Sequence, residues 1–111
     1  MIYLASPYSD PDPKVQQLRF EQVCRVAAAL MNGGTVVFSP IAHSHPIALA
    51  GGLPGDFTYW EEFDRAMLSV CKCLIVLKLP GWEQSKGIKA EMAIMREMGK
   101  PISFLDYRTH P

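Results

Sequence analysis

One segment combines a short apolar strand with polar side chains that could perform chemistry. The apolar run from Leu74 to Leu79 stops at Pro80-Gly81, a pattern that indicates a buried strand of a parallel sheet. Ser85, Gly87 and Glu91 follow at the start of a predicted helix. Ligands of open α/β sheets bind outside the carboxyl ends of the strands. We therefore expect the reaction centre here, with Glu91 about one turn inside the helix.

Each of these candidates also has an ordinary structural interpretation. A helical glutamate is usually exposed, so Glu91 could simply face solvent. Ser85 could cap the helix through its hydroxyl, and this role is compatible with a phosphate bound by the same helix amides. Asp64 lies on the helix predicted before the apolar strand, where it would be a surface carboxylate if it acted alone.

Two histidines and two tryptophans offer further chemistry. His43 and His45 are alternate residues of a segment without clear periodicity, and an extended backbone there would turn their rings apart. They could belong to a metal site, although no third-ligand motif accompanies them, or they could contact phosphate or substrate hydroxyls. Trp60 and Trp82 could stack on a base, but tryptophan more often fills core or interface space.

Strands and helices are expected to alternate, which predicts a parallel, doubly wound sheet with helices on both faces. The segment between Ser39 and Thr58 is long and irregular, so it is a candidate lid or binding loop. Thr58 and Glu61 have capping-box spacing at the start of the helix that follows. The expected elements are a strand at Ile2–Ala5, a helix from Lys14 to Asn32, a strand at Thr35–Phe38, a helix from Tyr59 to Val70, a strand at Leu74–Leu79, a helix that Gly99 ends, and a strand from Pro101.

Length and composition limit the class of protein. A chain of 111 residues makes one domain with a modest core, which favours a homo-oligomer. Eleven basic and eleven acidic side chains cancel, so a small-molecule partner is expected and not a nucleic acid polymer or a membrane. No apolar run approaches the roughly 18 residues of a membrane span, and no signal segment precedes the first strand, so the expected location is cytoplasmic. Cys24, Cys71 and Cys73 are odd in number, and Cys71 and Cys73, just before the apolar strand, suggest buried thiols and not a disulfide framework. A Cys-x-Cys metal site is the alternative, although no second matching pair accompanies it.

The sequence resembles the nucleoside 2-deoxyribosyltransferase and nucleotide N-glycosidase superfamily over nearly its whole length. The resemblance implies a flavodoxin-like (Rossmann-like) three-layer sandwich, in which residues 1–111 form a single domain around a small parallel sheet of four to five strands. The motifs that carry it are Ile2-Tyr3-Leu4-Ala5-Ser6-Pro7-Tyr8, Ser39-Pro40, Asp64, Leu74-Ile75-Val76-Leu77, Ser85-x-Gly87-x-x-x-Glu91 and Gly99-Lys100-Pro101-Ile102.

The same resemblance implies roles for individual residues. Glu91 would attack the anomeric carbon of the sugar, release the nucleobase and form a glycosyl-enzyme ester. Asp64 would bind or orient the sugar or the base. Members of the superfamily that act on nucleotides tend to have serine at the position of Ser85, which accepts a 5′-phosphate without adding a like charge. The substrate implied is therefore a nucleoside 5′-monophosphate.

The resulting hypothesis is cleavage or exchange of an N-glycosidic bond, without metal or organic cofactor. Two alternatives stay open: a nucleotide-binding module without catalysis, and a metal-assisted hydrolase that uses His43 and His45. The expected catalytic residues are Glu91 and Asp64, and the expected substrate-binding residues are Tyr3, Ser6, Pro7, Tyr8, His43, His45, Ser85 and Gly87.

Overall fold

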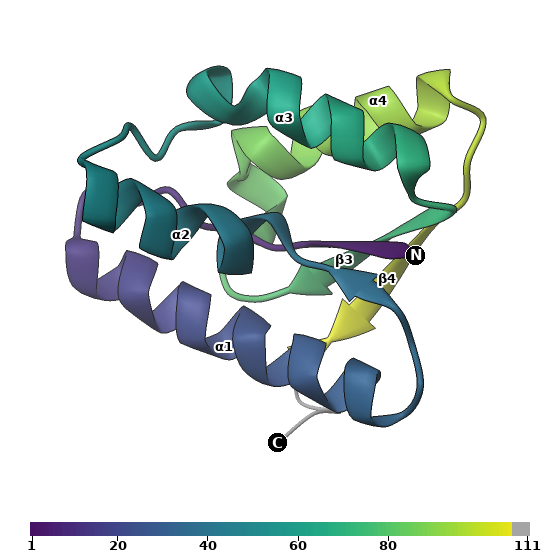
Figure 1. Ribbon diagram of the computed structural model, residues 1–111, viewed down its shortest axis with the longest axis horizontal. Coiled ribbons are helices and arrows are strands. Elements are labelled where there is room, and N and C mark those ends of the chain that lie inside the picture. Colours follow the sequence, from purple (N-terminus) through teal and green to yellow (C-terminus); the bar gives the residue numbers. More distant parts are fainter. Residues whose placement is uncertain (108–111) are drawn as a thin grey trace.

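A four-stranded parallel sheet forms the centre of the protein, and helices cover both of its faces (Figure 1). The computed structural model describes residues 1–107. The predicted α/β three-layer fold with a small parallel sheet is confirmed. The elements in chain order are β1 (Ile2–Ala5), α1 (Pro13–Asn32), β2 (Val37–Phe38), α2 (Pro40–Gly51), α3 (Phe57–Val70), β3 (Cys73–Lys78), the short 3-10 helix η1 (Trp82–Gln84), α4 (Lys86–Glu97) and β4 (Ile102–Asp106).

The strands contribute side chains to two separate cores, one on each face of the sheet. Tyr3 of β1 and Val76 of β3 pack with side chains of α3 and α4. Leu4 and Leu77, their neighbours along the same strands, pack with side chains of α1. Successive side chains of a strand point to opposite faces, so both faces of this sheet are buried. Burial on both faces explains why the run from Leu74 to Leu79 is almost continuously apolar.

The limits of α1 follow from capping residues. Asp12 is the N-cap, and its carboxylate accepts a hydrogen bond from the Lys14 amide at 2.9 Å. Pro13 occupies the first helical turn, where its missing N–H leaves no intrahelical bond unmade, so the predicted early helix position of Pro13 is confirmed. Gly33 is the C-cap and donates to the carbonyl of Ala29 at 3.2 Å.

The prediction of a loop between Ser39 and Thr58 is wrong, because most of that segment is α2. Ser39 caps this helix by accepting from the Ala42 amide at 3.2 Å, and Pro40 follows in its first turn. Gly52, with a φ of 66°, ends the helix. The helix is apolar on nearly all sides, so it has no helical periodicity to detect. The Ser-Pro start and the glycine stop were the available signals.

The predicted capping box at Thr58 and Glu61 is also wrong, because α3 begins one residue before Thr58. Asp56 is the N-cap, and Thr58 already lies inside the helix. Aspartate and threonine both favour the N-cap position, so residue type alone does not separate two candidates this close in sequence. A Cβ on Gly55 would lie 3.3 Å from the Tyr8 ring, so the residues before α3 pack closely on the loop after β1.

The strand order β2-β1-β3-β4, which the sequence did not reveal, positions the site. From β1 the chain crosses through α1 to β2 on one side, and from β3 it crosses through α4 to β4 on the other. The direction of winding therefore reverses between β1 and β3. A crevice outside the carboxyl ends of two such strands is the usual ligand site of a doubly wound sheet.

The three cysteines are free thiols. Cys71 is buried, as predicted, whereas Cys24 and Cys73 are only half-buried. Burial raises the pKa of the Cys24 and Cys71 thiols, which favours the neutral form of both. Within residues 1–107, none of the helices is long and apolar enough to cross a membrane.

Lys100 ties the end of α3 to the turn before β4, and its removal should destabilise the fold. Its ammonium donates to the carbonyls of Leu68, Ser69 and Cys71 at 3.1, 2.7 and 2.7 Å. A cation that satisfies terminal helix carbonyls also interacts favourably with the helix dipole. We expect Lys100→Met to lower the free energy of unfolding by about 1–3 kcal/mol, measured by urea denaturation.

Lys89→Met is the matched control for this prediction, because Lys89 is an exposed lysine of α4. Its replacement should change the free energy of unfolding by less than about 0.5 kcal/mol. Equal effects of the two substitutions would contradict a capping role for the Lys100 ammonium.

Candidate functional site

A pocket of about 650 Å³ lies where the loops after β1 and β3 meet the amino-terminal ends of α3 and α4. Its volume falls in the usual range for small-molecule sites. Seven of the ten predicted site residues line it: Ser6, Pro7, Tyr8, Asp64, Ser85, Gly87 and Glu91.

Glu91 is a buried carboxyl group at the wall of this pocket. Only 5% of the residue is exposed, so the solvent-facing interpretation of this helical glutamate is wrong. The hydroxyl of Tyr3, which is fully buried on β1, donates a hydrogen bond to Glu91 Oε2. Burial raises the pKa of Glu91 to about 8, the Tyr3 hydrogen bond opposes this rise, and the charge of Asp64 adds to it.

Asp64 is the second buried carboxyl group of the pocket. It lies on α3, and 6% of the residue is exposed, so it is not a surface carboxylate. Burial raises the pKa of Asp64 to about 7. Near neutral pH the pocket therefore holds two carboxyl groups that each exist partly in the protonated form. Such a pair can supply both a nucleophile and a proton donor.

The amino terminus of α4 faces the same pocket. Ser85 is the N-cap and accepts from the Ile88 amide at 3.2 Å, as its capping interpretation predicts. The next residues, Lys86 and Gly87, also line the pocket. Free amides at the start of a helix, together with the helix dipole and a lysine, favour an anionic group.

Arg19 is a pocket residue that the sequence analysis missed. From α1 its guanidinium donates to the carbonyls of Tyr8 at 3.3 Å and Ser9 at 3.0 Å after β1, and to that of Pro80 at 3.2 Å after β3. Arg19 therefore joins the two loops that form the site and places a positive charge in it. A single arginine on an amphipathic helix gives no pattern that would distinguish it from a surface residue.

Gly81 allows Arg19 to approach the loop after β3, and this contact can be tested. A Cβ at Gly81 would lie 2.7 Å from Arg19 Nη2, and the φ of Gly81 is +91°. Gly34 has the same φ but nothing within 4 Å of its Cβ position, so Gly34→Ala reports the backbone strain alone. We expect Gly34→Ala to cost about 1–2 kcal/mol of unfolding free energy, and Gly81→Ala to cost more in the same urea titration. Equal losses would show that Arg19 moves aside without cost.

A chain of hydrogen bonds connects the Tyr8 hydroxyl to α2 and α1. Tyr8 Oη lies 2.5 Å from His45 Nδ1, His45 Nε2 lies 2.9 Å from Gln17 Oε1, and Gln17 Nε2 donates to Glu21 at 3.0 Å. Since the Gln17 oxygen can only accept, His45 Nε2 carries the proton and Nδ1 accepts from Tyr8. Burial lowers the pKa of His45, which favours this neutral form. The Phe20 ring stacks on the His45 imidazole, with ring centroids 4.3 Å apart.

The two histidines have different surroundings. His45 is 4% exposed, and its ring is hydrogen-bonded to the Tyr8 hydroxyl. His43 is exposed on α2, and its ring stacks on Phe63 with ring centroids 4.8 Å apart. Within residues 1–107, no group of three or more His, Cys, Asp or Glu side chains is placed to hold a metal ion.

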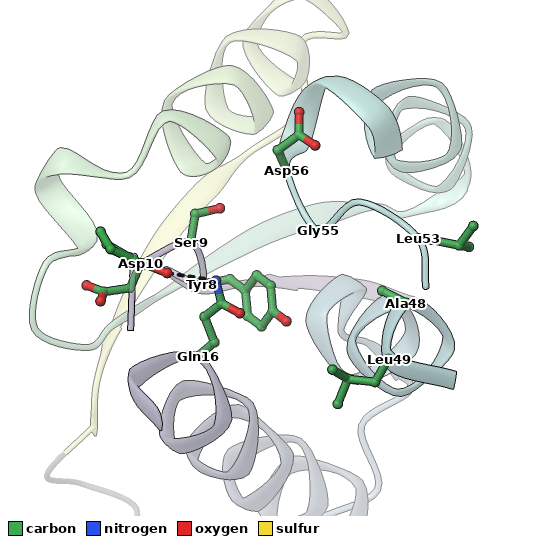
Figure 2. Close-up of a pocket in the computed structure, with 10 residues that line it drawn as sticks. Tyr8, Ser9, Asp10, Gln16, Ala48, Leu49, Leu53, Gly55 and Asp56 are labelled. Carbon is green, nitrogen blue, oxygen red and sulfur yellow. Dashed lines mark hydrogen bonds between the residues drawn. The ribbon is translucent and has the colours of Figure 1, made fainter. Parts of the chain in front are cut away.

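A second hollow, of about 520 Å³, adjoins the pocket (Figure 2). The Tyr8 ring lies between Gln16 of α1 and Ala48 of α2, and both residues line this hollow. Five residues line both cavities: Tyr8, Ser9, Asp10, Gly55 and Asp56. The loop before α3 and the Tyr8 ring therefore separate an inner pocket, which holds the buried carboxyl groups, from a more open outer hollow.

The sequence was also compared with known proteins. The profile described as "Domain of unknown function (DUF1937)" matches residues 1–107. The chain belongs to the DUF1937 family. No curated protein matches the sequence.

In this DUF1937 chain, the ten predicted residues separate into three groups. Seven line the pocket. Tyr3 does not line it but donates a hydrogen bond to Glu91, which does. His45 supports it indirectly through Tyr8, and His43 stacks on Phe63 without lining either cavity. The DUF1937 match covers all of these residues.

Proposed function

We propose that the chain cleaves the N-glycosidic bond of a nucleoside 5′-monophosphate, with Glu91 as the nucleophile. The observation that carries the proposal is a buried glutamate that lines a pocket at the reversal point of the sheet and accepts a hydrogen bond from Tyr3. A nucleophilic carboxylate needs such protection from water and such an orientation toward one face of the ligand.

The reaction consists of two displacements at the anomeric carbon of the sugar. A Glu91 oxygen bonds to that carbon while the bond to the nucleobase breaks, and the electron pair leaves with the base nitrogen. Protonated Asp64, whose pKa is about 7, can transfer its proton to this nitrogen. Water then attacks the same carbon, its proton returns to Asp64, and the ester bond to Glu91 breaks. The products are the free base and the sugar phosphate.

The 5′-phosphate has a matching site at the amino terminus of α4. Ser85, Lys86 and Gly87 line the pocket there, and Arg19 adds a second positive side chain. An anion at this place would be stabilised by the helix amides and kept apart from Glu91, which lies farther along the helix.

The test is release of free base from a panel of ribo- and deoxyribonucleoside 5′-monophosphates, followed by chromatography. The unphosphorylated nucleosides form the control arm, and they should react at least tenfold more slowly if the phosphate site is used. Metal chelator should leave the rate unchanged. Base release from nucleotides alone would support the proposal. Saturable nucleotide binding, seen as a thermal shift without any base release, would replace it with a non-catalytic binding module.

A further inference from the structure

Ser6 carries the one buried side-chain polar atom within residues 1–107 that has no hydrogen-bond partner. The residue follows β1, is 5% exposed and lines the pocket. Ser39 is equally buried, at 6% exposure, but its hydroxyl accepts from the Ala42 amide. A buried hydroxyl without a partner destabilises the folded protein, so such a group in a pocket indicates a ligand that completes it.

The surroundings of Ser6 indicate what kind of ligand group this is. The pocket places its positive side chains, Arg19 and Lys86, on α1 and at the start of α4, and its buried carboxyl groups, Glu91 and Asp64, on α4 and α3. Ser6 is neutral and can both donate and accept. A neutral ligand group that does the same is a hydroxyl, and the sugar ring of the proposed substrate carries a 2′-hydroxyl and a 3′-hydroxyl when it is ribose.

We propose that the Ser6 hydroxyl pairs with a ring hydroxyl of the substrate's sugar and so selects the sugar. This inference rests on the proposed function and extends it to the sugar. A pocket that is built to hydrogen-bond a substrate hydroxyl discriminates strongly against an analogue without it, because the protein group is then left unpaired. The chain should therefore prefer the sugar that carries this hydroxyl.

The experiment is a cycle of protein and substrate changes. Wild type and Ser6→Ala are assayed for kcat/KM on a ribonucleoside 5′-monophosphate, its 2′-deoxy and 3′-deoxy analogues, and the unphosphorylated ribonucleoside. Ser6→Ala should lower kcat/KM by about ten- to a hundredfold on the ribonucleotide. It should have no effect on the one analogue that lacks the paired hydroxyl, and this analogue identifies the hydroxyl. The ribonucleoside should show the same loss as the ribonucleotide.

Two results would overturn the inference. Equal losses on the ribonucleotide and both deoxy analogues would show that Ser6 does not contact a ring hydroxyl. A loss that disappears on the unphosphorylated nucleoside would assign Ser6 to the phosphate. If base release depends on Glu91 but Ser6→Ala has no effect, this inference fails while the proposed function stands. If no substrate turns over, the same comparison is made by calorimetry, as the affinity of each compound for Glu91→Gln with and without Ser6→Ala. Absence of all nucleotide binding would overturn both this inference and the proposed function.

Stability supplies an independent readout. Ser6→Ala removes an unpaired buried hydroxyl, so the thermal midpoint of the ligand-free protein should stay the same or rise. Ser39→Ala is the matched control, because it removes a hydroxyl that caps α2, and its midpoint should fall. A fall for Ser6→Ala as large as that for Ser39→Ala would show that Ser6 has a structural partner, which contradicts the inference.

Discussion

Glu91→Gln is expected to lower the rate of base release by about a thousandfold or more. Glutamine keeps the shape of the side chain and can still accept the hydrogen bond from Tyr3, but its neutral amide cannot form the glycosyl ester. The measurement is single-turnover base release on the best nucleotide of the panel. Glu83→Gln is the matched control, because Glu83 is exposed on η1 and does not line the pocket. An unchanged rate for Glu91→Gln would reject Glu91 as the nucleophile.

The same substitution should make the protein more stable at alkaline pH. In the folded state the Glu91 pKa is raised from its ordinary value of 4.5 to about 8. Below pH 4.5 both the folded and the unfolded states hold this proton. As the pH rises toward 8, the unfolded state releases it while the folded state keeps it, so wild-type stability falls across this range. Glutamine does not titrate and removes this loss, which is on the order of 3 to 5 kcal/mol at pH 8 and above.

Urea denaturation of wild type and Glu91→Gln at pH 5 and pH 8.5 measures this effect. The two proteins should differ little at pH 5, and the variant should be clearly more stable at pH 8.5. Lost activity together with gained stability cannot result from misfolding, so the pair of measurements separates a catalytic role from a structural one. Equal pH dependence of both proteins would show that Glu91 does not titrate in this range.

The sequence predicted the elements that have clear hydrophobic periodicity, and capping residues alone were not enough to reveal a helix. Burial on both faces makes β3 a continuous apolar run, and Pro13 and Gly33 mark the ends of α1. The helix α2 was missed because it is apolar on nearly all sides. Strand order could not be predicted either, since it depends on which strands pair across the sheet and not on any local pattern.

For the site, local spacing was enough to identify Ser85, Gly87 and Glu91 as a group, because all three lie in or just before α4, the helix that follows β3. The burial of Glu91 and Asp64 and the hydrogen bond from Tyr3 depend on long-range packing between β1, α3 and α4. No local signal encodes such contacts. Resemblance to a known superfamily suggested these residues, whereas Arg19 was found only through its contacts in three dimensions, and the unpaired state of the Ser6 hydroxyl only through its burial.

Tyr3→Phe and Asp64→Asn should shift the ionisation of Glu91 in opposite directions. The Tyr3 hydroxyl donates to the Glu91 carboxylate and lowers its pKa, whereas the negative charge of Asp64 raises it. Burial and the neighbouring carboxylates keep Tyr3 itself in the neutral form, because they raise its own pKa far above the ordinary value. Without the Tyr3 donor the Glu91 pKa should rise further, and without the Asp64 charge it should fall.

The Glu91 pKa is measured directly by ¹³C NMR titration of the carboxyl group, which does not require turnover. In the rate assay the reactive form has Glu91 ionised and Asp64 protonated, so base release in wild type should pass through a maximum between about pH 7 and pH 8. A rise of one unit in the pKa reduces the ionised fraction of Glu91 at pH 7 about tenfold, and Tyr3→Phe should therefore release base about tenfold more slowly at pH 7. Tyr59→Phe removes the hydroxyl of an exposed tyrosine and should change neither measurement. If Tyr3→Phe and Asp64→Asn shift the Glu91 pKa in the same direction, the hydrogen bond and the charge do not act on Glu91 as this pocket geometry requires.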